Sequence, residues 1–280
     1  MTITMLHYQR KLLVIVTLPL ALLLSQCSRK TEYVTTVVQS AADGLDLKAV
    51  TDLATKSNSA EAFEKSLNTP NNKINNLDLN EDDKVDYIKV TEIVEGDQRA
   101  FSLTTEIAKG EEQELCTIQF EKDPDGKSAN VQTHGNSQIY GNNHYYHHRT
   151  GIGEILLWSY LWNSHSPYYS RWGWNRYPSH YSAHSPRSYS NYRGIHKNAD
   201  YSKNVKQNSY SSISKPVKSP NFGKSASSIK APLKNPSTSQ RSFQTRNPSK
   251  TVRRSGFGSK SARFGSSSSS RSGSSFGGGK

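Results

Sequence analysis

The sequence lacks the features that would give a protein a covalent framework or a membrane span. Only two of its 280 residues are cysteine, Cys27 and Cys116. No run reaches the roughly 20 apolar residues that a bilayer-spanning helix needs. The longest, 12–24, has about 13 residues and is interrupted by Thr17 and Pro19. Folding must therefore rely on packing, and a membrane-spanning protein is not expected.

Catalytic signatures are missing as well. No Ser or Cys nucleophile has a plausible base nearby, no Gly-rich phosphate loop follows a strand, and no carboxylate pair stands out from surface acid. One cluster of imidazoles could suit zinc, copper or nickel, but no acidic or thiolate ligand shares its spacing. We therefore expect a protein that is not an enzyme. The clustered residues are His134, His144, His147 and His148.

The first residues have the order of an export signal. Arg10 and Lys11 precede the apolar run, and Leu24-Ser25-Gln26-Cys27 follows directly. This block resembles the lipobox of bacterial lipoproteins, in which the cysteine is acylated and becomes the mature amino terminus. Gln26 departs from the small residue that the family has before the cysteine, but an ordinary secretory signal fits less well because no A-x-A site is present.

The resemblance implies a signal peptide at 1–26, lipidation of Cys27 and a linker at 27–44. It implies a cell-envelope protein held on a membrane by its acyl chains, since each buried methylene contributes about 0.8 kcal/mol. The outer membrane or the cell surface is then favoured over the inner membrane. Cys116 is left without a partner, and its alternation with Ile118 and Phe120 predicts burial on one face of a strand.

Charge divides the remaining chain into two unlike halves. Residues 31–150 contain 11 Lys or Arg against 21 Asp or Glu, a net charge of −10, whereas residues 151–280 contain 21 against 2, a net of +19. The halves are expected to attract each other or different partners. The second half is poor in aliphatic residues, which predicts disorder because little apolar surface can offset chain entropy.

The acidic segment 45–150 is predicted to form a small α+β domain. Apolar spacing predicts two short helices, one with Asp43 as its cap and one that begins at Ser59 and ends before Pro70. From Val85 onward the period becomes two, with turn residues between the runs. This pattern predicts three or four antiparallel strands in a meander, with one face against the helices, followed by a long disordered tail.

An acidic loop lies between the expected helices and the sheet. Oxygen-bearing side chains recur at alternate positions, the arrangement with which a tight loop can surround calcium. The loop resembles the EF-hand and dockerin-type calcium loops, although Asp83 stands where that family has glycine and Lys89 where it has a bidentate Glu. The loss of that Glu predicts weak affinity, of the order of 10⁻⁴ to 10⁻³ M. The alternative is a solvated turn without calcium. The ligands that the resemblance implies are Asp78, Asn80, Asp82, the carbonyl of Lys84, and Asp86.

The segment from Leu45 to about Tyr146 is similar to a group of uncharacterised bacterial lipoproteins. The resemblance rests on the opening at 76–82 and the close at 135–141. It implies no activity.

Beyond the acidic domain, 151–194 forms an apolar and aromatic low-complexity segment. Its apolar stretch at 152–162 predicts either a helix or strand that docks on the domain or a segment at a membrane interface. The rest, 195–280, is basic and rich in Ser and Gly, and we predict that it is a disordered tail.

Three functions fit these observations. The first is a non-enzymatic envelope lipoprotein with a binding or structural role, and the second is a calcium-binding module. The third is a tail that binds polyanions such as anionic lipid or envelope polymer. Nucleic acid is an alternative polyanion because 253–258 and 263–265 resemble segments that bind single strands, but the export signal argues against it.

Overall fold

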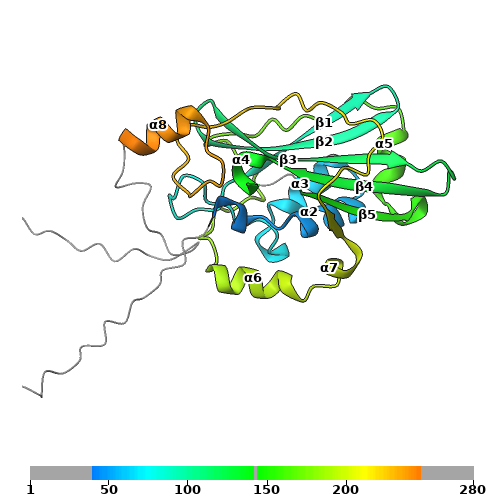
Figure 1. Cartoon of the computed structure of the whole chain (residues 1–280), viewed down its shortest axis with the longest axis horizontal. Coiled ribbons are helices and arrows are strands. Elements are labelled where there is room, and N and C mark those ends of the chain that lie inside the picture. Colours follow the sequence, from blue (N-terminus) through cyan, green and yellow to red (C-terminus); the bar gives the residue numbers. More distant parts are fainter. Residues whose placement is uncertain (1–39, 142–143, 247–280) are drawn as a thin grey trace, which may run out of the picture. The chain divides into compact units, whose positions relative to one another are not determined.

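A six-stranded antiparallel sheet organises the protein (Figure 1). The computed structural model describes residues 40–141 and 144–246. Each strand pairs with the next along the chain, so the sheet order is β1-β2-β3-β4-β5-β6. The strands are β1 Ile88–Glu95, β2 Gln98–Ala108, β3 Glu111–Lys122, β4 Ser128–Gly135, β5 Tyr145–Gly151 and β6 Lys206–Asn208.

Two helices precede the sheet and pack on one of its faces. In α3, Ala60–Leu67, the Ser59 hydroxyl accepts a hydrogen bond from the amide of Ala62, which confirms the predicted cap. In α2, Leu47–Lys56, the cap is Asp46 and not Asp43, because Asp43 belongs to the preceding 3-10 turn η1, Ala41–Gly44. A second 3-10 turn, η2 Pro70–Asn72, ends this region.

The prediction of three or four strands and two helices is wrong, although the arrangement is α+β in kind. Two strands were missed, β5 and β6. The residues of β5 are Tyr, His, Arg, Thr and Gly, and none is aliphatic. The strand therefore lacks the alternation of aliphatic and polar residues that predicts a strand from sequence. The additional helices are short: α4 Ser137–Tyr140, η3 Ile152–Glu154, α5 Leu157–Trp162, α6 Tyr189–Lys197, α7 Tyr201–Asn204 and α8 Thr238–Arg246.

The disorder predicted for most of the second half is also wrong over residues 151–246, which include 195–246 of the predicted tail. These residues form helices and a strand, and some of their apolar side chains join the core. The physical reason is that the second half does not need a core of its own, because it packs on the first. Its buried contributions to the core are Ile155, Leu157, Leu161, Ala226, Ile229 and Ala231. Residues 247–280 lie outside the described residues.

The apolar stretch at 152–162 docks on the domain. It forms η3 and α5, and Leu157 and Leu161 are buried. The rings of Trp158 and Trp162 stack with their centroids 3.9 Å apart. This outcome confirms docking, one of the two alternatives for this stretch.

The core lies between the sheet and helices α2 and α3. Phe101 is central to it, with its ring 5.6 Å from those of Phe63 on α3 and Phe120 on β3. Thr51 of α2 donates a hydrogen bond to Thr133 of β4. The inward residues of the strands are therefore covered by the first two helices.

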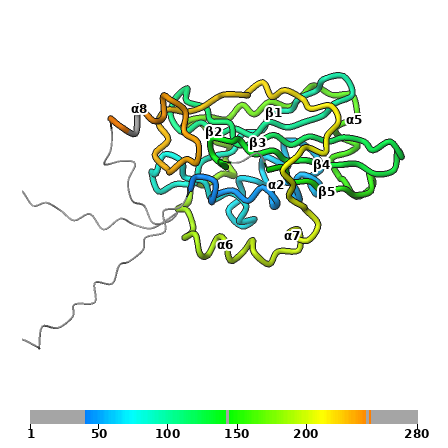
Figure 2. The backbone as a smooth tube through the Cα atoms, viewed as in Figure 1, coloured from blue at the N-terminus to red at the C-terminus, as the bar shows by residue number. Residues whose placement is uncertain are grey.

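The second half covers the opposite face and both edges of the sheet. Figure 2 shows the chain passing from α7 across the strands to α8. We call residues 211–228 of this path the covering segment. At the β1 edge, the amide of Ser170 donates to the carbonyl of Val90, and the amide of Glu92 donates to the carbonyl of Tyr168. At the other edge, β6 pairs with β5. Part of each edge is thereby paired from within the chain.

Candidate functional site: the acidic loop and the polar face of the sheet

The acidic loop is folded by its own side chains. The amides of Asp82 and Asp83 donate to the carboxylate of Asp78 at 3.0 and 3.1 Å, and the amide of Lys84 donates to Asp82 at 3.0 Å. Asp83 has a φ of 68° and Glu81 a φ of 53°. Asp83 therefore adopts the left-handed conformation for which the calcium-loop pattern has glycine.

Asp86 closes the base of this loop from a buried position. Its carboxylate accepts a hydrogen bond of 2.6 Å from the amide of Leu79. Burial raises the pKa of Asp86 well above its ordinary value, and the neighbouring charges of Asp78 and Asp82 raise it further. The base of the loop is thus a place where negative charge is unfavourable unless a proton or a cation balances it.

Asn80, another of the predicted calcium ligands, bonds to the backbone of the sheet. Asn80 uses its side-chain amide to donate to the carbonyl of Ile107 at 3.1 Å. Across the described residues, no group of three or more His, Cys, Asp and Glu side chains is arranged to hold a metal ion. The acidic loop has donors of the right chemistry for calcium, but in this conformation their oxygens bind backbone amides.

The four clustered histidines do not converge. His147 and His148 are neighbours on β5 and therefore point to opposite faces of the sheet. His134 stacks on Tyr145 with ring centroids 4.3 Å apart. Burial lowers the pKa of all three imidazoles named here, so each favours its neutral form.

Of the two cysteines, Cys116 is buried as predicted, at 1 % exposure. Burial raises the pKa of its thiol, with a further contribution from Glu114, so this sulfur is unreactive. Cys27, the signal peptide at 1–26 and most of the linker lie outside the described residues.

The outer face of the sheet is polar yet buried. Ser102 is fully buried because Ser219 and Asn221 of the covering segment donate to its hydroxyl at 3.0 and 2.9 Å. Gln119 likewise accepts from the amide of Val217 at 3.0 Å. The covering segment thus supplies hydrogen-bond partners to buried polar side chains of the sheet.

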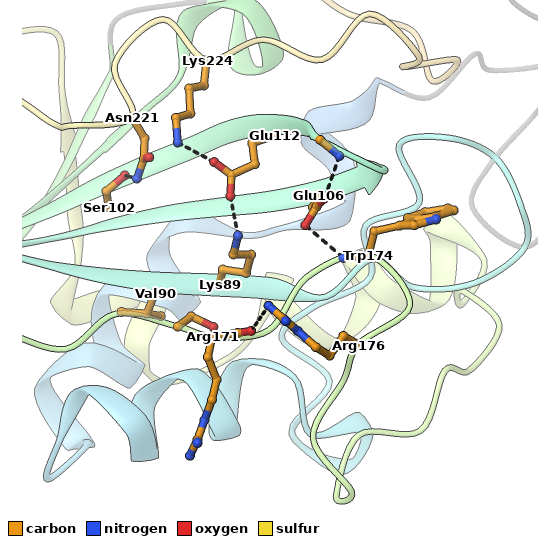
Figure 3. A network of polar contacts seen from close by, with 12 residues as sticks. Lys89, Val90, Ser102, Glu106, Glu112, Arg171, Trp174, Arg176, Asn221 and Lys224 are labelled. Carbon is orange, nitrogen blue, oxygen red and sulfur yellow. Dashed lines mark hydrogen bonds and ion pairs between the residues drawn. The ribbon is translucent and has the colours of Figure 1, made fainter.

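Charge complementarity joins the halves at the turn between β2 and β3. Figure 3 shows Glu112 between Lys89 of β1 and Lys224 of the covering segment, and both lysines form ion pairs with it. These cations lower the pKa of Glu112 against the opposing effect of its burial. Nearby, Glu106 accepts from the amide of Trp174 at 2.9 Å. Lys224 and Glu112 therefore form an ion pair between the basic and the acidic half.

Two carboxylates on the helix-covered side of the sheet also accept hydrogen bonds from the second half. Glu64 of α3 accepts from Tyr87, from the amide of Val90 and from Ser170, and its burial raises its pKa. Glu92, 1 % exposed, accepts from Tyr160 at 3.1 Å and contacts His165. Hydrogen bonding of this kind lets an acidic group remain inside the fold.

Comparison with known proteins gave no match to any family model, any curated protein or any solved structure. Among the helices of the described residues, none has the length and apolar character needed to cross a bilayer.

Helix α6, which carries Arg193 and Lys197 beside a cavity, was not predicted from the sequence. The signal was present, since Tyr189, Tyr192 and His196 recur at helical spacing. It was overlooked because the surrounding composition is that of a disordered chain.

Proposed function

We propose that this protein is a lipid-anchored protein of the bacterial cell envelope with a binding or structural role. The observation that carries the proposal is the block Leu24-Ser25-Gln26-Cys27 directly behind an apolar run too short to span a membrane. Twelve residues separate Cys27 from Ser40, where the described fold begins. Fully extended, such a linker spans about 40 Å, so the folded part would stay close to the membrane surface.

The proposal gives the buried carboxylates no catalytic role. Glu64 and Glu92 each accept a hydrogen bond from the second half, and these bonds hold the halves together. They serve the fold, and we assign no reaction to them.

Membrane fractionation with metabolic labelling by palmitate tests the proposal. The native chain is expected to carry label and to sediment with membranes, whereas Cys27→Ala is expected to lose the label and to accumulate unprocessed or enter the soluble fraction. Cys116→Ala is the matched control, because it removes the other thiol and should keep the label. A Cys27→Ala variant that is labelled and fractionates like the native chain would refute the proposal.

A second candidate function is weak calcium binding by the acidic loop. The observation that favours it is the buried Asp86, whose pKa is raised partly by Asp78 and Asp82. A divalent cation shared by these oxygens would relieve that repulsion. The residues that would hold it are Asp78, Asn80, Asp82, the carbonyl of Lys84, and Asp86.

Thermal melting at millimolar calcium and with chelator tests this second candidate. Calcium at ten times its Kd should stabilise the fold by about 1.4 kcal/mol, a rise of a few degrees in Tm. Asp82→Asn should weaken the rise, while Asp97→Asn in the turn between β1 and β2 should leave it unchanged. An unchanged Tm of the native chain at millimolar calcium would exclude the site.

A further inference from the structure

A cavity of about 610 Å³ lies where the start of α2 meets helices α6 and α7. Its walls come from both halves of the chain, with η1, α2 and β5 on one side and α6 and α7 on the other. The volume lies within the range of small-molecule sites. The cavity is separate from the acidic loop, whose predicted ligands do not line it.

Positive charge dominates its lining. Asp43 and Asp46 are the only acidic residues that line it, and both are engaged by backbone amides. Asp43 accepts from Ser40 at 2.9 Å, and Asp46 accepts from Lys48 at 2.8 Å. Within the described residues, none of the four cations of the lining forms an ion pair with a carboxylate. These cations are Lys48, Arg193, Lys197 and Lys234.

Tyrosine rings form the other part of the walls, and two of them are fixed by their hydroxyls. Tyr192 donates to the carbonyl of Ile74 at 2.6 Å and accepts from the amide of Asp46 at 2.9 Å. Tyr140 donates to the carbonyl of Leu45 at 3.2 Å. These hydroxyls hold the rings in place before any ligand arrives, which lowers the entropy lost on binding.

The ring of a third tyrosine, Tyr189, packs against the guanidinium of Arg193. The guanidinium of Arg193 lies over Tyr189, 5.7 Å from the ring centroid, and donates to its hydroxyl at 3.0 Å. Stacking of this kind orients an arginine fork toward a carboxylate or phosphate. Ser202 and Gln207 add polar side chains to the same cavity.

We propose that this cavity binds a small acidic saccharide, a sugar ring that carries a carboxylate or a phosphate. The C–H face of a sugar ring can pack on the negative face of a tyrosine. Its acidic group can pair with the lysines and Arg193 through charge-assisted hydrogen bonds, and its hydroxyls can bind Ser202 and Gln207. The choice of saccharides as the source of the anion rests on the proposed envelope location; the cationic, tyrosine-lined cavity does not.

Calorimetric titration of the soluble chain that begins after Cys27 tests the proposal independently of lipidation. The probes are trigalacturonate, its neutral trimethyl ester and tricarballylate, a tricarboxylate without a sugar ring. Trigalacturonate is expected to bind, and the ester, which has lost all three charges, at least about tenfold more weakly, since a single lost charge-assisted contact is already worth about that factor. Binding of tricarballylate more tightly than trigalacturonate would overturn the saccharide class.

The double variant Arg193→Ala/Lys197→Ala separates the cavity from general attraction to a basic surface. Both side chains are exposed on α6, so the fold should be kept, and the affinity for trigalacturonate should fall at least about tenfold. Lys215→Ala/Lys218→Ala removes two exposed charges outside the cavity and should leave the affinity within about twofold in 0.15 M salt, where the screening length is about 8 Å. Equal losses in both double variants, or no binding of trigalacturonate at about 10 mM, would overturn the proposal.

Discussion

The two halves of the described chain are folded by different means. Residues 40–150 contain the long strands and the aromatic centre around Phe101, whereas residues 151–246 contain a strand of three residues and helices of three to nine. The second half gains its order from hydrogen bonds to polar groups of the first, such as those of Asn221 and Ser219 to Ser102. A segment too polar for a core of its own can thus be ordered when a sheet supplies matching partners.

This difference predicts that contacts within the first half contribute most of the free energy of unfolding, and that the second half unfolds when the first half does. Two spectroscopic probes can separate them. Far-UV circular dichroism is dominated by the strands of the first half, and tryptophan fluorescence reports the second half alone. The tryptophans are Trp158, Trp162, Trp172 and Trp174.

The largest expected effect comes from the aromatic centre. Phe101→Ala should lower the free energy of unfolding by about 3 to 5 kcal/mol, because it leaves a cavity among fully buried rings. Phe222→Ala, at a phenylalanine of the covering segment that is 74 % exposed, should change it by less than about 0.5 kcal/mol. Urea unfolding followed by both probes measures this. Fluorescence unaffected by Phe101→Ala would show that the halves fold independently.

A smaller loss is expected where the covering segment meets the sheet. Asn221→Ala removes a donor to the buried Ser102 hydroxyl and should cost about 1 to 2 kcal/mol. The fluorescence transition should move at least as far as the dichroism transition, because the broken contact belongs to the second half. Ser214→Ala removes a donor to Glu121 at an exposed position and should cost less. A cost as large as that of Asn221→Ala would contradict this order of effects.

In the acidic loop, removal of the charge of Asp86 is expected to raise the free energy of unfolding, whereas Phe101→Ala and Asn221→Ala lower it. The raised pKa of Asp86 means that its contribution to stability is fully present below its ordinary pKa of 3.8 and is lost as pH rises through the higher folded pKa. In chelator at pH 7, Asp86→Asn should therefore raise the free energy of unfolding by on the order of 1 kcal/mol, since the amide oxygen can still accept from Leu79. The gain should vanish near about pH 4. A loss at pH 7 would show that the charge itself is required.

The smallest effect is expected at the ion pair between the halves. Lys224 is partly exposed and Glu112 keeps Lys89, so Lys224→Ala should cost less than about 1 kcal/mol, and less still in high salt. Lys218→Ala is the matched exposed control. A salt-independent loss of several kcal/mol would mean that charge, and not the neutral hydrogen bonds, holds the second half in place.

The sequence predicted the elements whose signal is apolar and local. The cap at Ser59, the buried Cys116 and the period-two runs of β1 to β4 are of this kind. It failed where order comes from distant polar contacts. Nothing in Gln119 or Ser102 itself indicates that residues some hundred positions later will bind it. The second half was predicted to be disordered for the same reason.

Hydrogen exchange followed by mass spectrometry on the intact chain tests most directly whether the second half is a folded cover. The amides of Ser170, Val217 and Lys230 each donate to an acceptor in the first half, at 3.0, 3.0 and 2.8 Å. Peptides across 165–172 and 211–231 should therefore exchange at least about a hundredfold more slowly than an unstructured chain. Exchange at the unstructured rate in these peptides, with β2 and β3 still protected, would contradict the account.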